Sequence, residues 1–105
     1  MGLEEHQKQV DERTSQFEPQ YRPLLELMAA MTEEVWEVAI EISHLIWHKK
    51  KKSWEDTKWL WQELVDVLFT TMCMANANGI DLQKEWYIML DKKLNKRDKN
   101  RFKKR

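Results

Sequence analysis

The sequence predicts a single all-α domain, and three observations support this prediction. The 105 residues include only two glycines and two prolines, too few for the turns that a sheet requires. Leu, Met, Lys and Glu, which favour helices, are abundant. Apolar residues recur three and four positions apart over long stretches, which is the period of an amphipathic helix. We therefore expect a bundle of four helices with two long helices at its centre.

The first predicted helix is short and peripheral. Its apolar residues Leu3, Val10 and Phe17 stand seven positions apart, so they form only a narrow stripe. The two prolines of the chain follow and mark a connector, because proline interrupts a helix. We expect residues 1–20 to form this peripheral helix and a linker.

The second predicted helix begins after Pro23 and is long. Apolar residues recur along it at helical spacing. They are Leu24, Leu27, Met28, Met31, Val35, Val38, Ile42 and Leu45. A run of lysines at residues 49–52 then interrupts the pattern.

The third predicted helix begins at a capping residue and ends at a glycine. Ser53, with Asp56 three residues later, has the form of an N-cap, and apolar residues continue from Leu60 at helical spacing. The pair Asn78-Gly79 predicts the end of the helix, because glycine readily adopts the left-handed conformation that closes one.

The fourth predicted helix is capped by Asp81. Its apolar residues are Leu82, Trp86, Met89, Leu90 and Leu94. Residues 98–105 contain mostly basic side chains and too little apolar surface to pack. We expect them to form a flexible basic tail.

The charge and the cysteine content argue against several classes of protein. The 18 basic and 18 acidic residues give a net charge of zero, which argues against a nucleic-acid partner. No apolar run approaches the ~20 residues that cross a bilayer, so we expect no membrane partner. The single cysteine, Cys73, cannot form an internal disulfide and suits a reducing compartment, so we expect a cytoplasmic protein.

The pattern of the two central helices predicts association between copies. Drawn at 100° per residue, each helix has an acidic stripe with an apolar stripe on either side. On the second helix these apolar stripes are Val35, Val38, Ile42 and Leu45, and Trp36, Ile40 and Trp47. On the third they are Leu60, Leu64, Val67, Thr71 and Met74, and Trp61, Val65, Phe69 and Met72. We expect one flank to pack within the subunit and the other against a neighbour, in a dimer or a dimer of dimers.

Two pairs of acids predict a metal site. Glu34 and Glu37 on the second helix, and Glu63 and Asp66 on the third, are each three residues apart, so each pair projects two carboxylates from one helical face. Burying such carboxylates costs several kcal/mol per ion unless a cation lies between them. Mg²⁺ prefers oxygen ligands of this kind. We therefore expect these four side chains to bind magnesium in a metal-dependent enzyme.

A solvated acidic face is the alternative interpretation of either pair alone, because such pairs are common on charged helices. The match between the two pairs favours the metal site. They occupy equivalent angular positions on two helices, and neither stripe carries a lysine or arginine that would offset the repulsion between like charges.

The chain resembles the MazG-like all-α nucleotide pyrophosphohydrolases, especially the short single-domain bacterial members. The resemblance runs from about residue 7 to residue 102. It is carried by the segments TEEVWEVAIEI, WQELVDVLFTTMCMANANGIDL and DKKLNKRDKNRF, which contain an E-x-x-E pair, an E-x-x-D pair and a K-x-x-x-R pair. It implies hydrolysis of (deoxy)nucleoside triphosphates to a monophosphate and pyrophosphate, which clears unwanted nucleotides from the cellular pool.

The resemblance also implies roles for individual residues. The four carboxylates would bind Mg²⁺, with Mn²⁺ as the alternative ion, and Glu34 or Glu37 would accept the proton of an attacking water. Lys93, Asn95 and Arg97 would contact the phosphates, and the two cations lie one turn apart on the fourth helix. Without the resemblance, the same cations would be interpreted as a solvated helix end.

Two further features have competing interpretations. Trp59 lies one turn before Glu63 and either stacks on the nucleobase or fills the core, and the sequence does not decide between these roles. His44 and His48 extend the acidic stripe of the second helix. A dinuclear iron bundle normally has two E-x-x-H motifs, which this chain lacks, so we reject that interpretation.

The chain departs from the family at two positions. Trp36 and Val65 stand where the family usually has glycine, which permits close approach of neighbouring backbones. The larger side chains either push helices apart or fill a contact between subunits or a pocket. The alternative function is therefore a catalytically weak or engineered helical bundle whose Trp-rich flank serves assembly or ligand binding.

Overall fold

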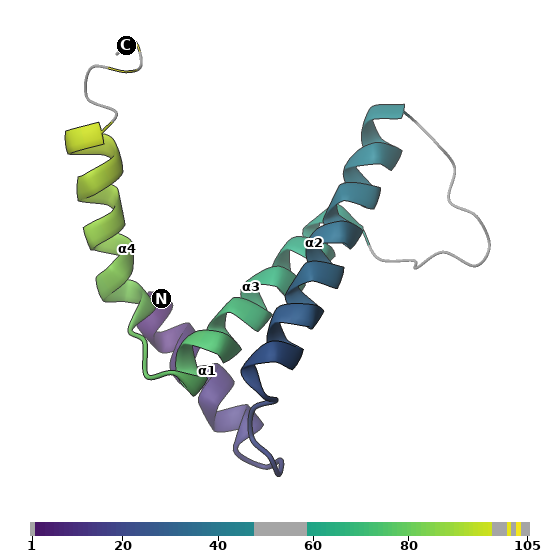
Figure 1. Ribbon diagram of the computed structural model, residues 1–105, viewed down its shortest axis with the longest axis vertical. Coiled ribbons are helices and arrows are strands. Elements are labelled where there is room, and N and C mark those ends of the chain that lie inside the picture. The colour runs from purple at the N-terminus through teal and green to yellow at the C-terminus, as the bar shows by residue number, and fades with distance from the viewer. Residues whose placement is uncertain (1, 48–58, 98–100, 102, 104–105) are drawn as a thin grey trace.

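The computed structural model describes residues 2–47, 59–97, 101 and 103, and the regular structure within them is entirely helical (Figure 1). The helices are α1 (Leu3–Thr14), α2 (Leu24–Trp47), α3 (Leu60–Ala77) and α4 (Leu82–Leu90), and a wider π-helical segment, η1 (Asp91–Arg97), continues α4. The predicted all-α class, with two long central helices, is confirmed. The expected cap at Ser53, the lysine run and most of the expected basic tail lie outside the described residues.

The helices form an open V (Figure 1). Helices α2 and α3 lie side by side and antiparallel as one arm, which we call the α2–α3 arm. Helix α4 with η1 forms the other, the α4 arm, and α1 lies across the base, where it packs on both α3 and α4. The radius of gyration is 17.2 Å, whereas a compact domain of this length has about 13 Å.

The start of α3 differs from the sequence expectation. Trp59 occupies its N-cap position with extended backbone angles, so the helix does not run on from the expected cap at Ser53. The side chain of Gln62 satisfies the free backbone amide there, because its Oε1 accepts a hydrogen bond of 2.8 Å from the Trp59 N–H. A side chain three residues into the helix thus caps α3 at Trp59, and the expected cap at Ser53 lies outside the described residues.

The corner between α3 and α4 forms as the sequence predicts. Helix α3 ends at Ala77, and Gly79 follows with φ of 66°, in the left-handed region that glycine enters without strain. Asp81 caps α4, since its carboxylate accepts hydrogen bonds from the backbone N–H groups of Gln83 and Lys84 at 3.1 and 3.2 Å. The direction in which α4 leaves is therefore set within four residues.

A buried polar network, which we call the base clasp, ties this corner to α1. The Gln7 Nε2 donates to Asn76 Oδ1 and to the Ile80 carbonyl, both at 2.9 Å, and the Gln7 Oε1 accepts from the Leu82 N–H at 2.8 Å. The Asn76 Nδ2 donates to the Gln7 carbonyl at 2.9 Å and to the Tyr21 hydroxyl at 3.1 Å. In both amide side chains the oxygen accepts a hydrogen bond and the nitrogen donates two. The clasp therefore fixes the start of α4 relative to α1 and α3.

The apolar core of one chain is small. The fully buried apolar residues within the described part are Leu27, Met72, Cys73 and Ala75. Large apolar side chains remain exposed along the outside of the α2–α3 arm, which we call its outer face. They include Val35, Trp36, Ile46, Trp47, Trp61, Leu64, Val65 and Phe69. None of the described helices has both the length and the apolar content to span a membrane.

Candidate active site

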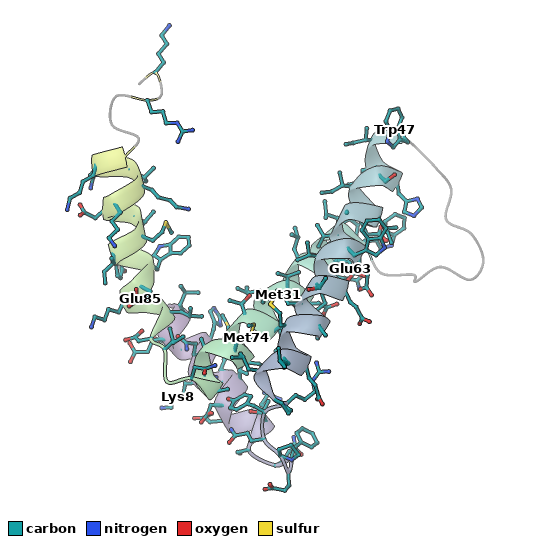
Figure 2. The ribbon with its side chains drawn as sticks, in the orientation of Figure 1. Lys8, Met31, Trp47, Glu63, Met74 and Glu85 are labelled. Carbon is teal, nitrogen blue, oxygen red and sulfur yellow. The ribbon has the colours of Figure 1, made fainter. Side chains whose placement is uncertain are left out.

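The α2–α3 arm buries charge and exposes apolar surface. On α2, Glu34 is half-buried and Glu41 is 4% exposed, while on α3 Glu63 is 1% exposed. Figure 2 places Glu63 on this arm. A soluble helical pair normally has the opposite arrangement, with apolar residues between the helices and carboxylates in water. The interface between α2 and α3 is therefore built around acidic side chains.

One hydrogen-bonded contact crosses this interface directly. The Thr70 hydroxyl on α3 lies 2.8 Å from Oε1 and 2.9 Å from Oε2 of Glu34 on α2, so it donates to that carboxylate. Thr70 itself is buried. A hydrogen bond from a fixed hydroxyl holds the Glu34 carboxylate in one place.

Glu37 and Asp66 complete the predicted set. Both are half-buried, and each occupies the next turn on the same side of its helix as the more buried acids. Helices α2 and α3, which carry these two residues, are antiparallel and pack side by side. The predicted carboxylates thus all lie on the two helices that pack against each other.

The four carboxylates do not form a finished coordination shell. Within the described residues, no three His, Cys, Asp or Glu side chains are close enough together to hold a metal ion. Their chemistry nonetheless fits a hard cation, because all four offer carboxylate oxygens. The contact between Glu34 and Thr70 demonstrates that side chains reach across the interface. The residues therefore fit magnesium by donor type, and their convergence on one ion stays a prediction.

The two substitutions of family glycines lie away from these carboxylates. Trp36 is 68% exposed and Val65 is 62% exposed, and both belong to the outer face. Neither side chain occupies the space between α2 and α3. Within one chain they add apolar surface without filling the acidic interface.

Trp59 is not a core residue. It is 46% exposed and stacks on Trp61 with ring centroids 5.8 Å apart and planes inclined by 12°. The interpretation of Trp59 as a core filler is therefore wrong. The pair forms an aromatic surface at the start of α3, one turn before Glu63, and its role in stacking on a base remains a prediction.

The predicted phosphate-binding residues lie on the other arm. Lys93 helps to line a shallow, open hollow of about 350 Å³, with Glu85, Ile88, Met89 and Lys92. Figure 2 places Glu85 on the α4 arm, across the V from Glu63. One chain alone therefore does not bring these cations to the carboxylates.

Asn95 already has a partner in η1. Its Nδ2 donates to Asp91 Oδ1 at 3.2 Å, and Lys96 forms an ion pair with the other oxygen of Asp91 at 3.2 Å. The hydrogen bond from Asn95, and then the charge of Lys96, hold the pKa of Asp91 below its ordinary value. Asn95 has to release Asp91 before it can contact a phosphate. Arg97 ends η1, and its side chain lies outside the described residues.

The sequence analysis assigned no role to two residues that the structure buries in this arm. These are Thr70, which holds Glu34, and Glu41, which is buried within the stripe of α2. Their angular positions on the helical wheels were the available signal. Cys73 on α3 is buried, and burial raises the pKa of its thiol, while the charge of Arg22 opposes this and the charge of Glu34 adds to it.

The model of the MazG nucleotide pyrophosphohydrolase domain matches residues 22–102. This chain belongs to that family. The uncharacterized protein YpjD of Bacillus subtilis strain 168 is 39% identical to this MazG chain over 100 residues, which cover 95% of this chain and 89% of YpjD.

Two crystal structures resemble the MazG chain closely. That of YpjD from Bacillus subtilis has a TM-score of 0.74 at 37% identity and covers 90% of this chain and 96% of that one. That of a Bacillus-conserved MazG protein, a nucleotide pyrophosphohydrolase, has a TM-score of 0.71 at 36% identity over 88% of each chain. The resemblance inferred from the sequence is confirmed, and this MazG protein is a nucleotide pyrophosphohydrolase by family.

Proposed function

We propose that this MazG protein hydrolyses (deoxy)nucleoside triphosphates between the α and β phosphates, in a Mg²⁺-dependent reaction that gives a monophosphate and pyrophosphate. The observation that carries the proposal is the inverted polarity of the α2–α3 arm, where Glu41 and Glu63 are buried beneath an apolar outer face. A scaffold that needed only to fold would place those carboxylates in water. Family membership supports action on a nucleotide pyrophosphate bond.

Glu34, Glu37, Glu63 and Asp66 would hold the metal. Bound there, Mg²⁺ would neutralise charge on the phosphates and lower the pKa of a coordinated water, and Mn²⁺ is the alternative ion. Both ions accept the hard oxygen donors that this set provides.

The surroundings of the two candidate general bases favour Glu37 over Glu34 as the residue that accepts the proton of the attacking water. Both oxygens of Glu34 lie within hydrogen-bond distance of the Thr70 hydroxyl, which commits that carboxylate to a fixed position. Glu37 is half-buried at the edge of the stripe, where water has access. In our proposal Glu37 accepts the proton of the attacking water and Glu34 acts as a ligand.

The remaining roles concern the substrate. Lys93, Asn95 and Arg97 would contact the phosphates and offset the charge that develops on the leaving pyrophosphate. Trp59 would offer a π-face to the nucleobase, since stacking on an exposed aromatic ring accepts any base.

We also propose that the protein works as a homo-oligomer, a dimer or a tetramer, in the cytoplasm, where it removes surplus or noncanonical nucleotides. The exposed outer face supports association. The single cysteine supports a reducing compartment.

The competing proposal is a catalytically weak bundle whose Trp-rich flank serves assembly or ligand binding. The exposure of Trp36 and Trp61 supports an interaction role for that flank. The acidic interface, which the flank does not fill, favours the enzyme, and both roles can belong to one molecule.

The test is a panel of ribo- and deoxyribonucleoside triphosphates incubated with the protein and Mg²⁺, with ³¹P NMR to distinguish pyrophosphate from orthophosphate. We expect pyrophosphate and a monophosphate from at least one nucleotide. Glu37→Gln should lower turnover by roughly 10² to 10⁴-fold, which is the rate enhancement that a general base usually contributes. It should leave the thermal midpoint unchanged or higher, because it removes like-charge repulsion.

The matched control for this variant is Glu33→Gln. Glu33 is the neighbouring exposed acid on α2, so its change should leave turnover unaltered. Absence of product from every nucleotide, with the protein folded, would support the competing proposal instead.

A further inference from the structure

We infer that Arg22, in the connector between α1 and α2, binds the terminal phosphates of the nucleotide, which lies along α3 with its base at Trp59 and its phosphates toward the base of the V. This role rests on the proposed function, because Arg22 would belong to that same site. Arg22 is not among the phosphate contacts that the family resemblance implied.

The fold fixes the backbone on both sides of Arg22. The Tyr21 hydroxyl accepts a hydrogen bond from Asn76 Nδ2 at 3.1 Å and donates one to Asp11 Oδ1 at 2.7 Å. The residue before Arg22 is therefore held against α3. The residue after it is Pro23, whose ring biases Arg22 toward an extended conformation, and α2 begins directly afterwards. The position of Arg22 is thus set before any ligand binds.

Three residues of α3 mark successive turns that run from the base of the V toward the carboxylates. They are Asn76, Cys73 and Thr70. Tyr21 contacts the first of them, and Glu34 contacts the third. The connector and the carboxylates of α2 therefore lie over neighbouring turns of the same helix.

The turn between these two contacts lies near both Arg22 and Glu34. Burial raises the pKa of the Cys73 thiol, the charge of Arg22 opposes this, and the charge of Glu34 adds to it. Coulombic effects decrease with distance, so both charges lie in the neighbourhood of one thiol. Arg22 is therefore close to Glu34, at the end of the row of carboxylates that is nearest the base.

The guanidinium of Arg22 is open to a ligand. The side chain is exposed, and it forms no hydrogen bond or ion pair with any other described residue. The helices of the α2–α3 arm contain seven acidic residues and no lysine or arginine. A polyphosphate at this arm needs a cation, and a guanidinium suits it because the planar fork donates two parallel hydrogen bonds to a phosphate.

The order of residues along α3 sets the direction of the nucleotide. Trp59, the proposed platform for the base, precedes the helix, and Cys73 beside Arg22 lies near its other end. The helix rises by about 20 Å between residues 60 and 73. An extended nucleoside triphosphate and the reach of an arginine side chain together cover that length. The α phosphate would then meet the carboxylates, and the β and γ phosphates would lie toward Arg22.

In this orientation Arg22 stabilises the leaving group. The oxygen of the attacking water forms a bond to the α phosphorus, and the bond between that phosphorus and the bridging oxygen breaks. The electron pair stays on the pyrophosphate, while the proton of the water passes to Glu37. A guanidinium at the terminal phosphates offsets the negative charge that develops there.

Affinities for three probes in the presence of Mg²⁺ test this role. The probes are inorganic pyrophosphate, a deoxynucleoside monophosphate, and the triphosphate of the same base with an imido group in place of the α–β bridging oxygen. Arg22→Ala should weaken binding of pyrophosphate and of the triphosphate analogue by about 10- to 100-fold, the usual effect of losing a hydrogen bond to a charged group. Binding of the monophosphate should not change. Isothermal titration calorimetry measures the three affinities.

Two further variants sharpen the test. Arg22→Lys should recover only part of the loss, because an ammonium group keeps the charge but not the planar fork. The matched control is Arg13→Ala, which removes an exposed arginine from the last turn of α1 and should leave all three affinities unaltered. Thermal unfolding should give the same midpoint for every variant, because neither side chain is buried.

Two results would overturn the inference. One is unchanged affinity of Arg22→Ala for pyrophosphate and the triphosphate analogue. The other is an equal loss of affinity for the monophosphate, which would mean that Arg22 acts through the carboxylates and not on the terminal phosphates. If either result accompanies nucleotide hydrolysis by the wild type, the proposed function stands without Arg22. Pyrophosphate binding that depends on Arg22, without hydrolysis of any nucleotide, would instead overturn the proposed function and leave the phosphate contact standing.

Discussion

The base of the V and the α2–α3 arm both bury polar side chains, but of different kinds. At the base, Gln7 and Asn76 are neutral amides, and each finds hydrogen-bond partners of matching type within the chain. In the arm, Glu41 and Glu63 are carboxylates buried under apolar residues. A satisfied amide network fixes a fold, whereas charge held in a helix interface is costly and is a feature of functional sites. The comparison separates the part of the molecule that fixes the start of α4 from the part where we propose that the chemistry takes place.

The largest effect should come from Glu63→Gln in the arm. Removing one anionic metal ligand should reduce turnover by at least about 100-fold, while the neutral side chain of equal size relieves the cost of burying charge. The thermal midpoint should therefore stay the same or rise. Steady-state kinetics and thermal unfolding measure the two effects, with the exposed Glu26→Gln on α2, the other helix of the arm, as control. Retained activity with a lower midpoint would make Glu63 a structural residue.

Asn76→Ala at the base should show the reverse pattern. It removes three hydrogen bonds in the clasp and should lower the free energy of unfolding by about 1–3 kcal/mol. Urea unfolding measures this change. The control is Asn78→Ala two residues later, whose exposed side chain donates to the Met74 carbonyl, and it should change the free energy by no more than about 0.5 kcal/mol. Equal losses from both variants would contradict a special role for the clasp.

Thr70→Val should have a smaller effect on the site. It removes the hydroxyl that holds Glu34 and keeps the shape of the side chain. Loss of such a supporting contact should raise the Mg²⁺ concentration needed for half-maximal activity by about tenfold. Metal titration of activity measures it. Thr71→Val is the control, because the Thr71 hydroxyl donates only within its own helix, to the Val67 carbonyl at 2.8 Å, and a similar shift in both variants would remove Thr70 from the site.

The smallest effect should be a loss of stability at alkaline pH that comes from Tyr21 at the base of the V. Burial raises the pKa of Tyr21 above its ordinary value of 10.0, the hydrogen bond with Thr14 opposes this, and the bond that Tyr21 donates to Asp11 adds to it. A raised pKa in the folded state means that the stabilising contribution is complete below pH 10 and is lost as the pH rises through the folded value. Thermal unfolding at rising alkaline pH should show this loss in the wild type. Tyr21→Phe should lack it, and identical profiles would exclude Tyr21 as the cause.

The sequence predicted the helices more accurately than the residues at which they begin and end. It indicated which acidic residues matter but not which side chains surround them. Helical periodicity and the pair Asn78-Gly79 are local signals, and they located α2, α3 and the corner correctly. The start of α3 was wrong because Gln62 provides a cap to Trp59 that no serine signal indicates. Among the predicted site residues, helical wheels placed Glu34 and Glu63 at equivalent angular positions on the two central helices, and their shared role at a metal stays a prediction.

The separation of Lys93 from the carboxylates could not be predicted from the sequence. The direction of α4 depends on bonds between Gln7 and residues 69 to 75 positions away in the sequence. Neither periodicity nor spacing reports contacts of that range. The same limit applies to the contact between Thr70 and Glu34, which joins two helices 36 positions apart.

Because the corner at Asn78 to Asp81 is short, a single insertion or deletion there has a large effect on the direction of α4. A helix turns by about 100° for each residue, so inserting or deleting a single residue at the end of α3 would redirect the whole of α4 by that angle. The sequences of both arms would be untouched. One short indel would thereby change which surface the side chains of α4 meet, without a substitution in either arm.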